Sequence, residues 1–163
     1  MPEKAVLDTS FLINIKKLGC LDLLCDVFAE VILSPEVWKE SFQFHKELES
    51  LSCISLTKMS AEENQLVEQL HEEFTETFPG KHRGEIETLV IAKVRRIQLV
   101  ISDNFAPWFI RRIHSEFENI KIFRGMYFFS RIFELEMLNK DFLDKLRGIY
   151  PEKEITRLRE AIE

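Results

Sequence analysis

Short apolar runs alternate along the chain with segments whose apolar residues recur at helical spacing. The runs at residues 5–7, 31–33, 98–101 and 119–123 are rich in β-branched residues and end at polar or turn-forming residues, which is typical of buried strands. Residues 51–57 are a weaker candidate for a strand or an extended segment. The pattern therefore predicts four or five short strands.

Helices are predicted between these runs in the first third of the chain. Apolar residues from Phe11 onward recur at helical spacing and predict a helix that stops at Gly19. A second short helix is expected at residues 21–28. Pro35 stands where the first turn of another helix should begin, because its ring presets a helical φ and its missing N–H costs nothing there.

The rest of the chain is predicted to be mainly helical. Ser60 and Glu63 have the spacing of a capping box, which predicts an acidic helix to about Glu76. Residues 84–96 are apolar nearly all round and predict a buried helix, and a further helix should run to about Glu116. After residue 126 we expect two or three helices, with breaks near residues 139–140, 148 and 151.

Strands that alternate with helices across short turns predict an α/β fold, in which a parallel sheet carries helices on both faces. A length of 163 residues predicts a single domain with one site. In folds of this kind, ligands bind beyond the carboxyl ends of the strands, where helix N-termini gather. The residues that follow each strand are therefore the first candidates for function.

The composition is that of an ordinary globular protein, with 45% hydrophobic and 31% charged residues. The longest run without a charged residue, at 50–57, is far shorter than the roughly 18 residues of a membrane span, so no membrane partner is expected. The N-terminus lacks the pattern of a secretory signal, and a cytoplasmic location is expected by default. Cys20, Cys25 and Cys53 are odd in number and lack CxxC spacing, so neither a disulfide framework nor a zinc site is predicted.

Charge is distributed unevenly along the chain. The formal net charge is −6, which argues against a nucleic-acid partner. However, residues 1–79 carry 6 basic and 15 acidic side chains, whereas residues 80–163 carry 16 basic and 13 acidic ones. An acidic region beside a mildly basic one could bind divalent cations and a polyanion next to each other.

Carboxylates follow three of the predicted strands. Asp8 follows the first run, Glu36 and Glu40 follow the second, and Asp103 follows the run at 98–101. The helix that leads into that last strand begins with Gly84 and adds Glu85 in its first turn. Converging carboxylates need a positive counter-charge, and a hard divalent cation such as Mg²⁺ takes oxygen ligands and phosphate oxygens. Metal-dependent phosphodiester cleavage is the reaction class that fits.

Simpler roles compete at each of these positions. Asp8, Ser102, Asp103 or Asn104 could each be no more than a helix N-cap. Glu36 could complement a helix dipole, and Glu40 could be a surface residue that pairs with a lysine. Glu85 and Glu87 lie about 200 degrees apart around a helix, so only one of them can point into a given site.

Four short segments resemble a known family. They read VLDTSFLI at residues 6–13, SPEVWKE at 34–40, GEIETLVIA at 84–92 and VISDN at 100–104. In this order and strand context they resemble the motifs of the PIN domain family, and the residues from Gly125 onward are similar to its VapC-like prokaryotic branch. The resemblance implies a three-layer α/β/α PIN-like (RNase H-like) fold. It covers a core at about 4–137, followed within the single domain 1–163 by a helical extension at about 138–163.

The resemblance also implies a site and an activity. Asp8, Glu40, Glu85 and Asp103 would be the catalytic residues and the ligands of Mg²⁺ or Mn²⁺, with Glu36 and Asn104 as the alternatives to Glu40 and Asp103. The implied activity is that of a metal-dependent endoribonuclease, the toxin of a toxin-antitoxin pair. The implied partners are an RNA substrate, an antitoxin protein and a second copy of the chain in a homodimer.

Three further expectations concern the surroundings of this site. Thr9, Ser10 and Ser102 could orient a carboxylate or a substrate phosphate. His82 could act as a general base, but a solvated loop histidine is expected. Basic residues of the second half are candidates for contacts with a phosphate backbone: Lys81, Arg83, Lys93, Arg95, Arg96, Arg111, Arg112 and Arg124.

Two rival functions remain open from the sequence. A catalytically silent PIN-like module would keep the fold and bind RNA or a protein without turnover. A phosphoacceptor domain would also use a strand-end aspartate, but it needs a partnering lysine at the end of a late strand, and no clear one is present.

Overall fold

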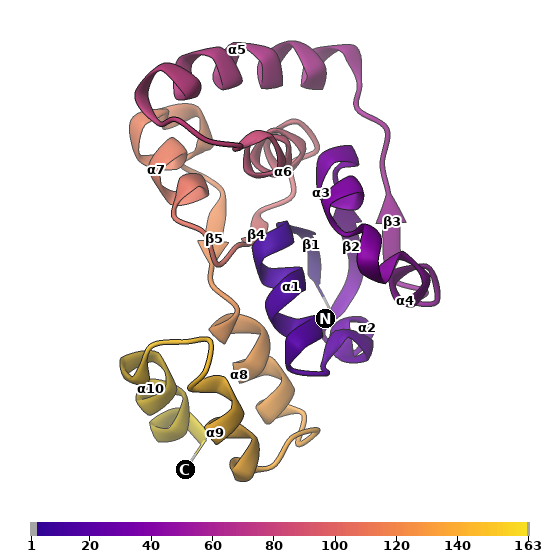
Figure 1. Ribbon diagram of the computed structural model, residues 1–163, viewed down its shortest axis with the longest axis vertical. Helices are drawn as coiled ribbons and strands as arrows, with labels where there is room; N and C mark the ends of the chain where they lie inside the picture. The colour runs from indigo at the N-terminus through magenta and orange to yellow at the C-terminus, as the bar shows by residue number, and fades with distance from the viewer. Residues whose placement is uncertain (1–2, 163) are drawn as a thin grey trace.

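The computed structural model describes residues 3–162, which form a five-stranded parallel sheet with helices on both faces (Figure 1). The strand order is β3-β2-β1-β4-β5, and every neighbouring pair is parallel. The strands are β1 (Glu3–Leu7), β2 (Phe28–Leu33), β3 (Ile54–Leu56), β4 (Leu99–Ile101) and β5 (Lys121–Phe123). The order changes direction between β1 and β4, which makes the carboxyl ends of these two strands the expected place for a site.

The helices connect these strands and extend beyond them. They are α1 (Thr9–Lys17), α2 (Leu24–Val27), α3 (Pro35–Glu40), α4 (His45–Glu49), α5 (Ala61–Thr77), α6 (Arg83–Val94), α7 (Ala106–Ile113), α8 (Met126–Glu134), α9 (Leu143–Leu146) and α10 (Glu152–Ile162). Single 3₁₀ turns cover Leu21–Leu23, Phe42–Phe44, Ser115–Phe117 and Lys140–Phe142. Within residues 3–162, no helix combines the length and the apolar character needed to cross a lipid bilayer.

Alternation along the central strands builds a core on each face of the sheet. Ala5 and Leu7 of β1 face a core that α1, α2 and α8 cover, whereas Val6 faces a second core beneath α5, α6 and α7 (Figure 1). Successive side chains of a strand point to opposite faces, so one apolar run can supply both cores. The three-layer α/β/α architecture is thereby confirmed.

The C-terminal helices belong to the first of these cores. Leu146, Tyr150 and Leu158 are buried in the same apolar cluster as Phe11 and Phe128. In Figure 1, α9 and α10 lie against α8 at the end of the molecule opposite α5. The expected helical extension is therefore packed as a continuation of the domain.

Local signals predicted most helix starts and some helix lengths. The capping box is confirmed, since Ser60 Oγ accepts from the Glu63 N–H (3.1 Å) and the Glu63 carboxylate accepts from the Ser60 N–H (2.7 Å). The expected continuous helix at 21–28 is wrong, because a 3₁₀ turn and the short α2 replace it and Phe28 already belongs to β2. The helix expected to reach Glu116 ends at Ile113, because the backbone of His114 is extended.

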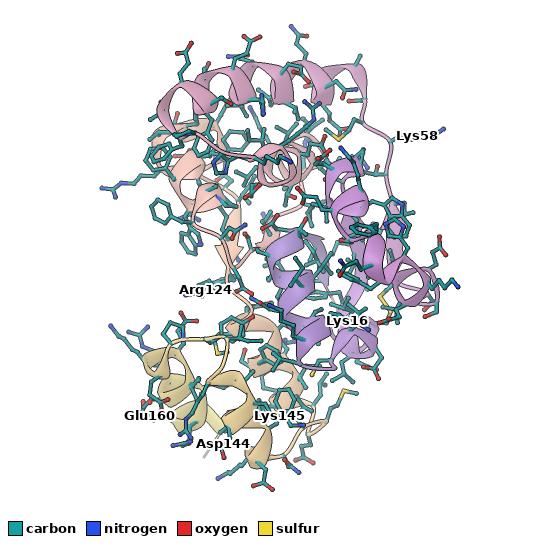
Figure 2. The ribbon with its side chains drawn as sticks, viewed as in Figure 1. Lys16, Lys58, Arg124, Asp144, Lys145 and Glu160 are labelled. Carbon is teal, nitrogen blue, oxygen red and sulfur yellow. A yellow bond between two sulfur atoms is a disulfide. The ribbon has the colours of Figure 1, made fainter. Side chains whose placement is uncertain are left out.

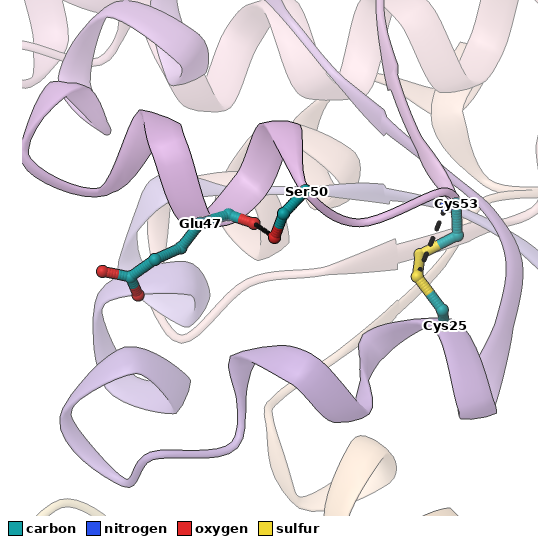
Figure 3. Close-up of a disulfide and its surroundings, with 4 residues drawn as sticks. All are labelled: Cys25, Glu47, Ser50 and Cys53. Atoms are coloured by element: carbon teal, nitrogen blue, oxygen red, sulfur yellow. Dashed lines mark hydrogen bonds between the residues drawn. A yellow bond between two sulfur atoms is a disulfide. The ribbon is translucent and has the colours of Figure 1, made fainter.

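The expectation of no disulfide is also wrong. Cys25 of α2 and Cys53, which directly precedes β3, form a disulfide with their Cα atoms 5.3 Å apart (Figure 3). The Cys53 N–H also points at the Cys25 sulfur (3.3 Å). The two cysteines are 28 residues apart, and only the parallel pairing of β2 with β3 brings them together, which sequence spacing does not reveal. Cys20 is buried and free.

Candidate functional site

Asp8 lies directly after β1, at the central edge of the sheet, and is 1% exposed. It occupies the N-cap position of α1 but makes no side-chain cap bond, so the simple capping role does not apply. Its Oδ2 instead accepts from Ser10 Oγ (2.6 Å) and from Ser102 Oγ (2.7 Å), which follows β4. Burial raises the pKa of Asp8, and these hydroxyl donors lower it by a smaller amount.

Glu40 is the last residue of α3, and its carboxylate points towards the start of α1, beside Asp8. Its Oε2 accepts a hydrogen bond from Thr9 Oγ1. Helix α6 lies beside α3 and begins close to this carboxylate, because Gly84 has no side chain: a Cβ there would be 3.1 Å from Glu40 Oε2. Glu36, the alternative to Glu40, pairs with Lys39 on the surface (3.5 Å).

The two glutamates of the first turn of α6 point in different directions, as their angular separation predicts. Glu85 is 8% exposed and faces Asp8 and Glu40. Glu87 accepts from the backbone N–H of Glu36 (2.9 Å) and from Arg83 Nε (3.2 Å), so it caps the start of α3. Glu85 therefore belongs to the carboxylate cluster, whereas Glu87 positions the helix that carries Glu40.

The loop after β4 begins with three polar residues, of which Ser102 donates to Asp8. Asn104 Nδ2 donates to Glu85 Oε1 (3.1 Å) and lies 3.5 Å from Asp8 Oδ2. Ser10 Oγ accepts from the Asp103 N–H (3.0 Å) and so ties this loop to the start of α1. The loop thus contributes the hydroxyl of Ser102 and the amide of Asn104 to the cluster.

The carboxylate of Asp103 is held by donors from three other segments. Its Oδ2 accepts from Asn14 Nδ2 (2.8 Å) and from Tyr150 OH (2.7 Å), and its Oδ1 accepts from the Gly125 N–H (2.8 Å). Gly125 permits this approach, since a Cβ there would be 2.0 Å from the Tyr150 hydroxyl oxygen. The sequence predicts Asp103 as the fourth ligand. In the structure, its carboxylate accepts from donors of α1, of the start of α8 and of the C-terminal segment.

Asp8, Glu40 and Glu85 form the cluster, in which neighbouring carboxylates disfavour ionisation of Glu40 and of Glu85. Burial, then the charge of Asp8 and then that of Glu40 raise the pKa of Glu85 to about 7. Burial raises the pKa of Glu40, and Asp8 adds to this effect. Within residues 3–162, no three acidic, histidine or cysteine side chains are close enough to form a ready-made metal-binding group.

His82 differs from the solvated loop histidine that the sequence led us to expect. Both ring nitrogens are buried and have no hydrogen-bond partner within residues 3–162, and Nδ1 lies 3.8 Å from Glu85 Oε1. The ring packs edge-on against Phe74 of α5, with ring centroids 4.8 Å apart. No sequence signal distinguished this histidine, because its burial depends on a helix that precedes it along the chain.

Most of the basic residues proposed for phosphate contacts are engaged in the fold. Arg83 pairs with Glu68 and Glu87, and Arg95 pairs with Glu63 (2.6 Å). Arg112 is exposed and makes no hydrogen bond or ion pair within residues 3–162. Only part of the expected basic track is therefore free to meet a ligand.

Comparison with known proteins agrees with this architecture. Residues 4–117 match the family DUF3368, described as a PIN domain. No curated protein matches the sequence.

The range matched by the family, residues 4–117, begins in β1 and includes α3, α6 and the loop after β4, so it contains every element that contributes to the carboxylate cluster. PIN domains are commonly nucleases. With most of its length matched and the parallel α/β/α architecture in place, the chain belongs to the PIN-domain family.

Proposed function

We propose that the protein is a metal-dependent endoribonuclease that hydrolyses RNA phosphodiester bonds. The observation that carries this proposal is the cluster of Asp8, Glu40 and Glu85 where the strand order changes direction, with the pKa of all three carboxyls raised. A protein gains no stability from bringing three carboxylates together without a counter-charge. Such an arrangement is typical of a site that binds a cation.

The chemistry of these donors fits Mg²⁺ or Mn²⁺. Asp8, Glu40 and Glu85 offer only oxygen atoms, which hard divalent cations prefer, and they would hold the ion directly or through waters. Cation binding would stabilise the ionised form of Glu85, whose pKa is raised to about 7 by burial and by the charges of Asp8 and Glu40. When bound, the ion would supply Lewis-acid polarisation of the phosphoryl oxygen and a water of lowered pKa.

The other polar groups of the site orient the carboxylates. Ser10 and Ser102 fix Asp8, and Thr9 fixes Glu40, through hydroxyls that donate to each carboxylate. Asn104 fixes Glu85 in the same way. His82 lies close enough to Glu85 to exchange a proton with it through a small movement of either side chain.

We further propose that the protein acts as the toxin of a toxin-antitoxin pair in the cytoplasm, as a homodimer whose activity an antitoxin protein restrains. This part rests on the similarity of the segment from Gly125 onward to VapC-like proteins. Its test is co-expression with neighbouring genes. A toxin stops growth when expressed alone, and an adjacent gene product restores growth and co-purifies with it.

A catalytically silent RNA- or protein-binding module is the second candidate. The observation that favours it is the engagement of Asp103 with Tyr150 and Asn14, so that this loop contributes the neutral side chains of Ser102 and Asn104 to the cluster. A site with three carboxylates instead of four would bind a divalent cation more weakly.

Cleavage of a mixed RNA pool with Mg²⁺ or Mn²⁺ tests the proposal. Wild-type protein is compared with Asp8→Asn and with an EDTA control, because contaminating nucleases are common. A matched pair sharpens the test, since Glu40→Gln should abolish cleavage whereas Glu36→Gln, on the same helix but paired with Lys39, should not. Intact RNA with both metals, together with no Mn²⁺ binding by calorimetry, would establish the silent module instead.

A further inference from the structure

A cavity of about 740 Å³ opens beside the carboxylate cluster, along α7. Asn104, which donates to Glu85, forms part of its wall, so the cavity and the cluster share a boundary. The remaining wall is mainly aromatic and basic, and it includes Phe105, Trp108, Arg111, Arg112 and Arg124. Glu118 and Asp103 are its acidic residues, and the carboxylate of Asp103 is already held by the fold.

Helix α7 presents its aromatic side chains outward for a local reason. Ala106 and Ile110 face the core, which turns Phe105, Trp108 and Arg112 to the opposite side at spacings of three and four residues. Phe105 is 71% exposed and Trp108 is 36% exposed. Large aromatic side chains gain stability when they leave water, so two of them exposed together beside a cavity indicate a binding surface.

The aromatic surface has a fixed base. Phe109, the next residue of α7, packs against Phe78 and Phe74 of the α5 region, with ring centroids 4.5 Å and 5.9 Å away. Arg111 donates to the carbonyl of Ile120 (2.8 Å), and its guanidinium lies 5.3 Å from the centre of the Trp108 ring. The Arg111 cation therefore covers one face of the Trp108 ring and holds the ring in position.

Positive charge surrounds the aromatic rings. Arg112 has no ion-pair partner within residues 3–162. Arg124 lies at the passage from β5 to α8 (Figure 2), where it pairs with Glu154 (2.6 Å). Exposed aromatic rings interleaved with arginines match the chemistry of single-stranded nucleic acid, in which bases stack on the rings and phosphates meet the guanidinium groups.

We propose that Phe105, Trp108 and Arg112 form a platform that binds an unpaired stretch of RNA next to the carboxylate cluster. A base stacks on Trp108, a neighbouring base stacks on Phe105, and Arg112 contacts the phosphate between them. A duplex is excluded from this platform, because its bases are already stacked on one another. The selection of unpaired segments for cleavage rests on the proposed nuclease function, whereas RNA binding at the platform does not.

Binding is tested in the Asp8→Asn protein, which keeps RNA intact, with a fluorescently labelled 12-nucleotide single strand and anisotropy as the readout. Trp108→Ala should weaken binding on the order of ten- to 100-fold, and Trp108→Phe should retain most of it. Ile113→Ala is the matched control, because Ile113 is an exposed apolar residue of the same helix outside the cavity. Arg112→Ala should lower the slope of log Kd against log salt by about 0.7. Thermal melts verify that each variant is folded.

Three results would overturn the platform. The first is that the Trp108→Ala and Phe105→Ala variants bind the single strand as tightly as the Ile113→Ala variant does. A duplex of the same sequence could compete equally well with the single strand. An acidic peptide could displace the RNA and lose its own affinity in Trp108→Ala, which would make the occupant a protein.

Failure of the nuclease proposal looks different from failure of the platform. If the Asp8→Asn protein binds single strands through Trp108 while wild-type protein cleaves nothing, the platform stands without the nuclease. If wild-type and Trp108→Ala proteins cleave unpaired RNA with the same KM, the nuclease stands without the platform.

Discussion

Replacement of Glu85 by glutamine should stabilise the metal-free protein, and only above a certain pH. Glu85 is nearly buried beside Asp8, and its pKa is about 7 in the folded protein against 4.5 in a free glutamate. A carboxyl whose folded pKa is raised contributes its full stability below pH 4.5, and this contribution is lost as the pH rises through 7. Glutamine keeps the shape and the oxygen that accepts from Asn104 but carries no charge.

The size of the effect follows from this shift. Each pKa unit corresponds to about 1.4 kcal/mol, so a rise from 4.5 to about 7 sets an upper limit of about 3.5 kcal/mol on the destabilisation at pH 8. Partial access of solvent to the cluster screens the charges and reduces this to about 2 kcal/mol. For a domain of this size, such a difference corresponds to roughly 4 to 8 °C in Tm.

The assay is thermal unfolding in EDTA at pH 5, 6, 7 and 8, with wild type, Glu85→Gln and the surface control Glu36→Gln. The variant should lie close to wild type at pH 5, exceed it increasingly up to about pH 7 and keep this advantage at pH 8, while the control follows wild type throughout. Addition of Mn²⁺ at pH 8 should reverse the order, because only wild type gains stability from the bound ion. A Glu85→Gln protein that is no more stable than wild type at pH 8, or equally stabilised at every pH, would refute the argument.

Three further changes probe the surroundings of the site. Tyr150→Phe removes a donor to the buried Asp103 and should lower the free energy of unfolding by about 1 to 3 kcal/mol in urea titrations; a change below about 0.5 kcal/mol would show that Asp103 does not depend on it. Gly84→Ala places a Cβ 3.1 Å from Glu40 Oε2, so Mn²⁺ affinity measured by calorimetry should fall several-fold while the helix stays folded, and unchanged affinity would remove Glu40 as a ligand. Reduction with dithiothreitol opens the Cys25–Cys53 loop and should cost about 3 kcal/mol, seen as a lower Tm that Cys25→Ser reproduces; a Tm indifferent to reductant would mean that the bond does not form in solution.

The sequence predicted those parts of the site that depend on backbone topology. Asp8 follows an apolar run and Glu85 opens a helix that is apolar all round, so the position of each along the chain determined its place in space. The angular separation of Glu85 from Glu87 predicted that only one of them faces the cluster.

The sequence did not predict features that depend on contacts between distant segments. Asp103 and Asn104 are adjacent and chemically similar, and what separates them is the hydroxyl of Tyr150, 47 residues further along the chain. The burial of His82 and the pairing of Cys25 with Cys53 likewise depend on neighbours brought close only by the completed sheet and its helices.

The hydrogen bond between Tyr150 and Asp103 has a consequence for how the protein matures. The ribosome makes residue 150 well after it has made all three carboxylates and the whole of the family-matched region. Domains generally fold as units, and the loop that carries Asn104 has its full set of hydrogen bonds only once residue 150 has been made. A nascent chain would then hold all three carboxylates before the loop beside them is fully anchored, and the docking of the final helices would complete that anchoring.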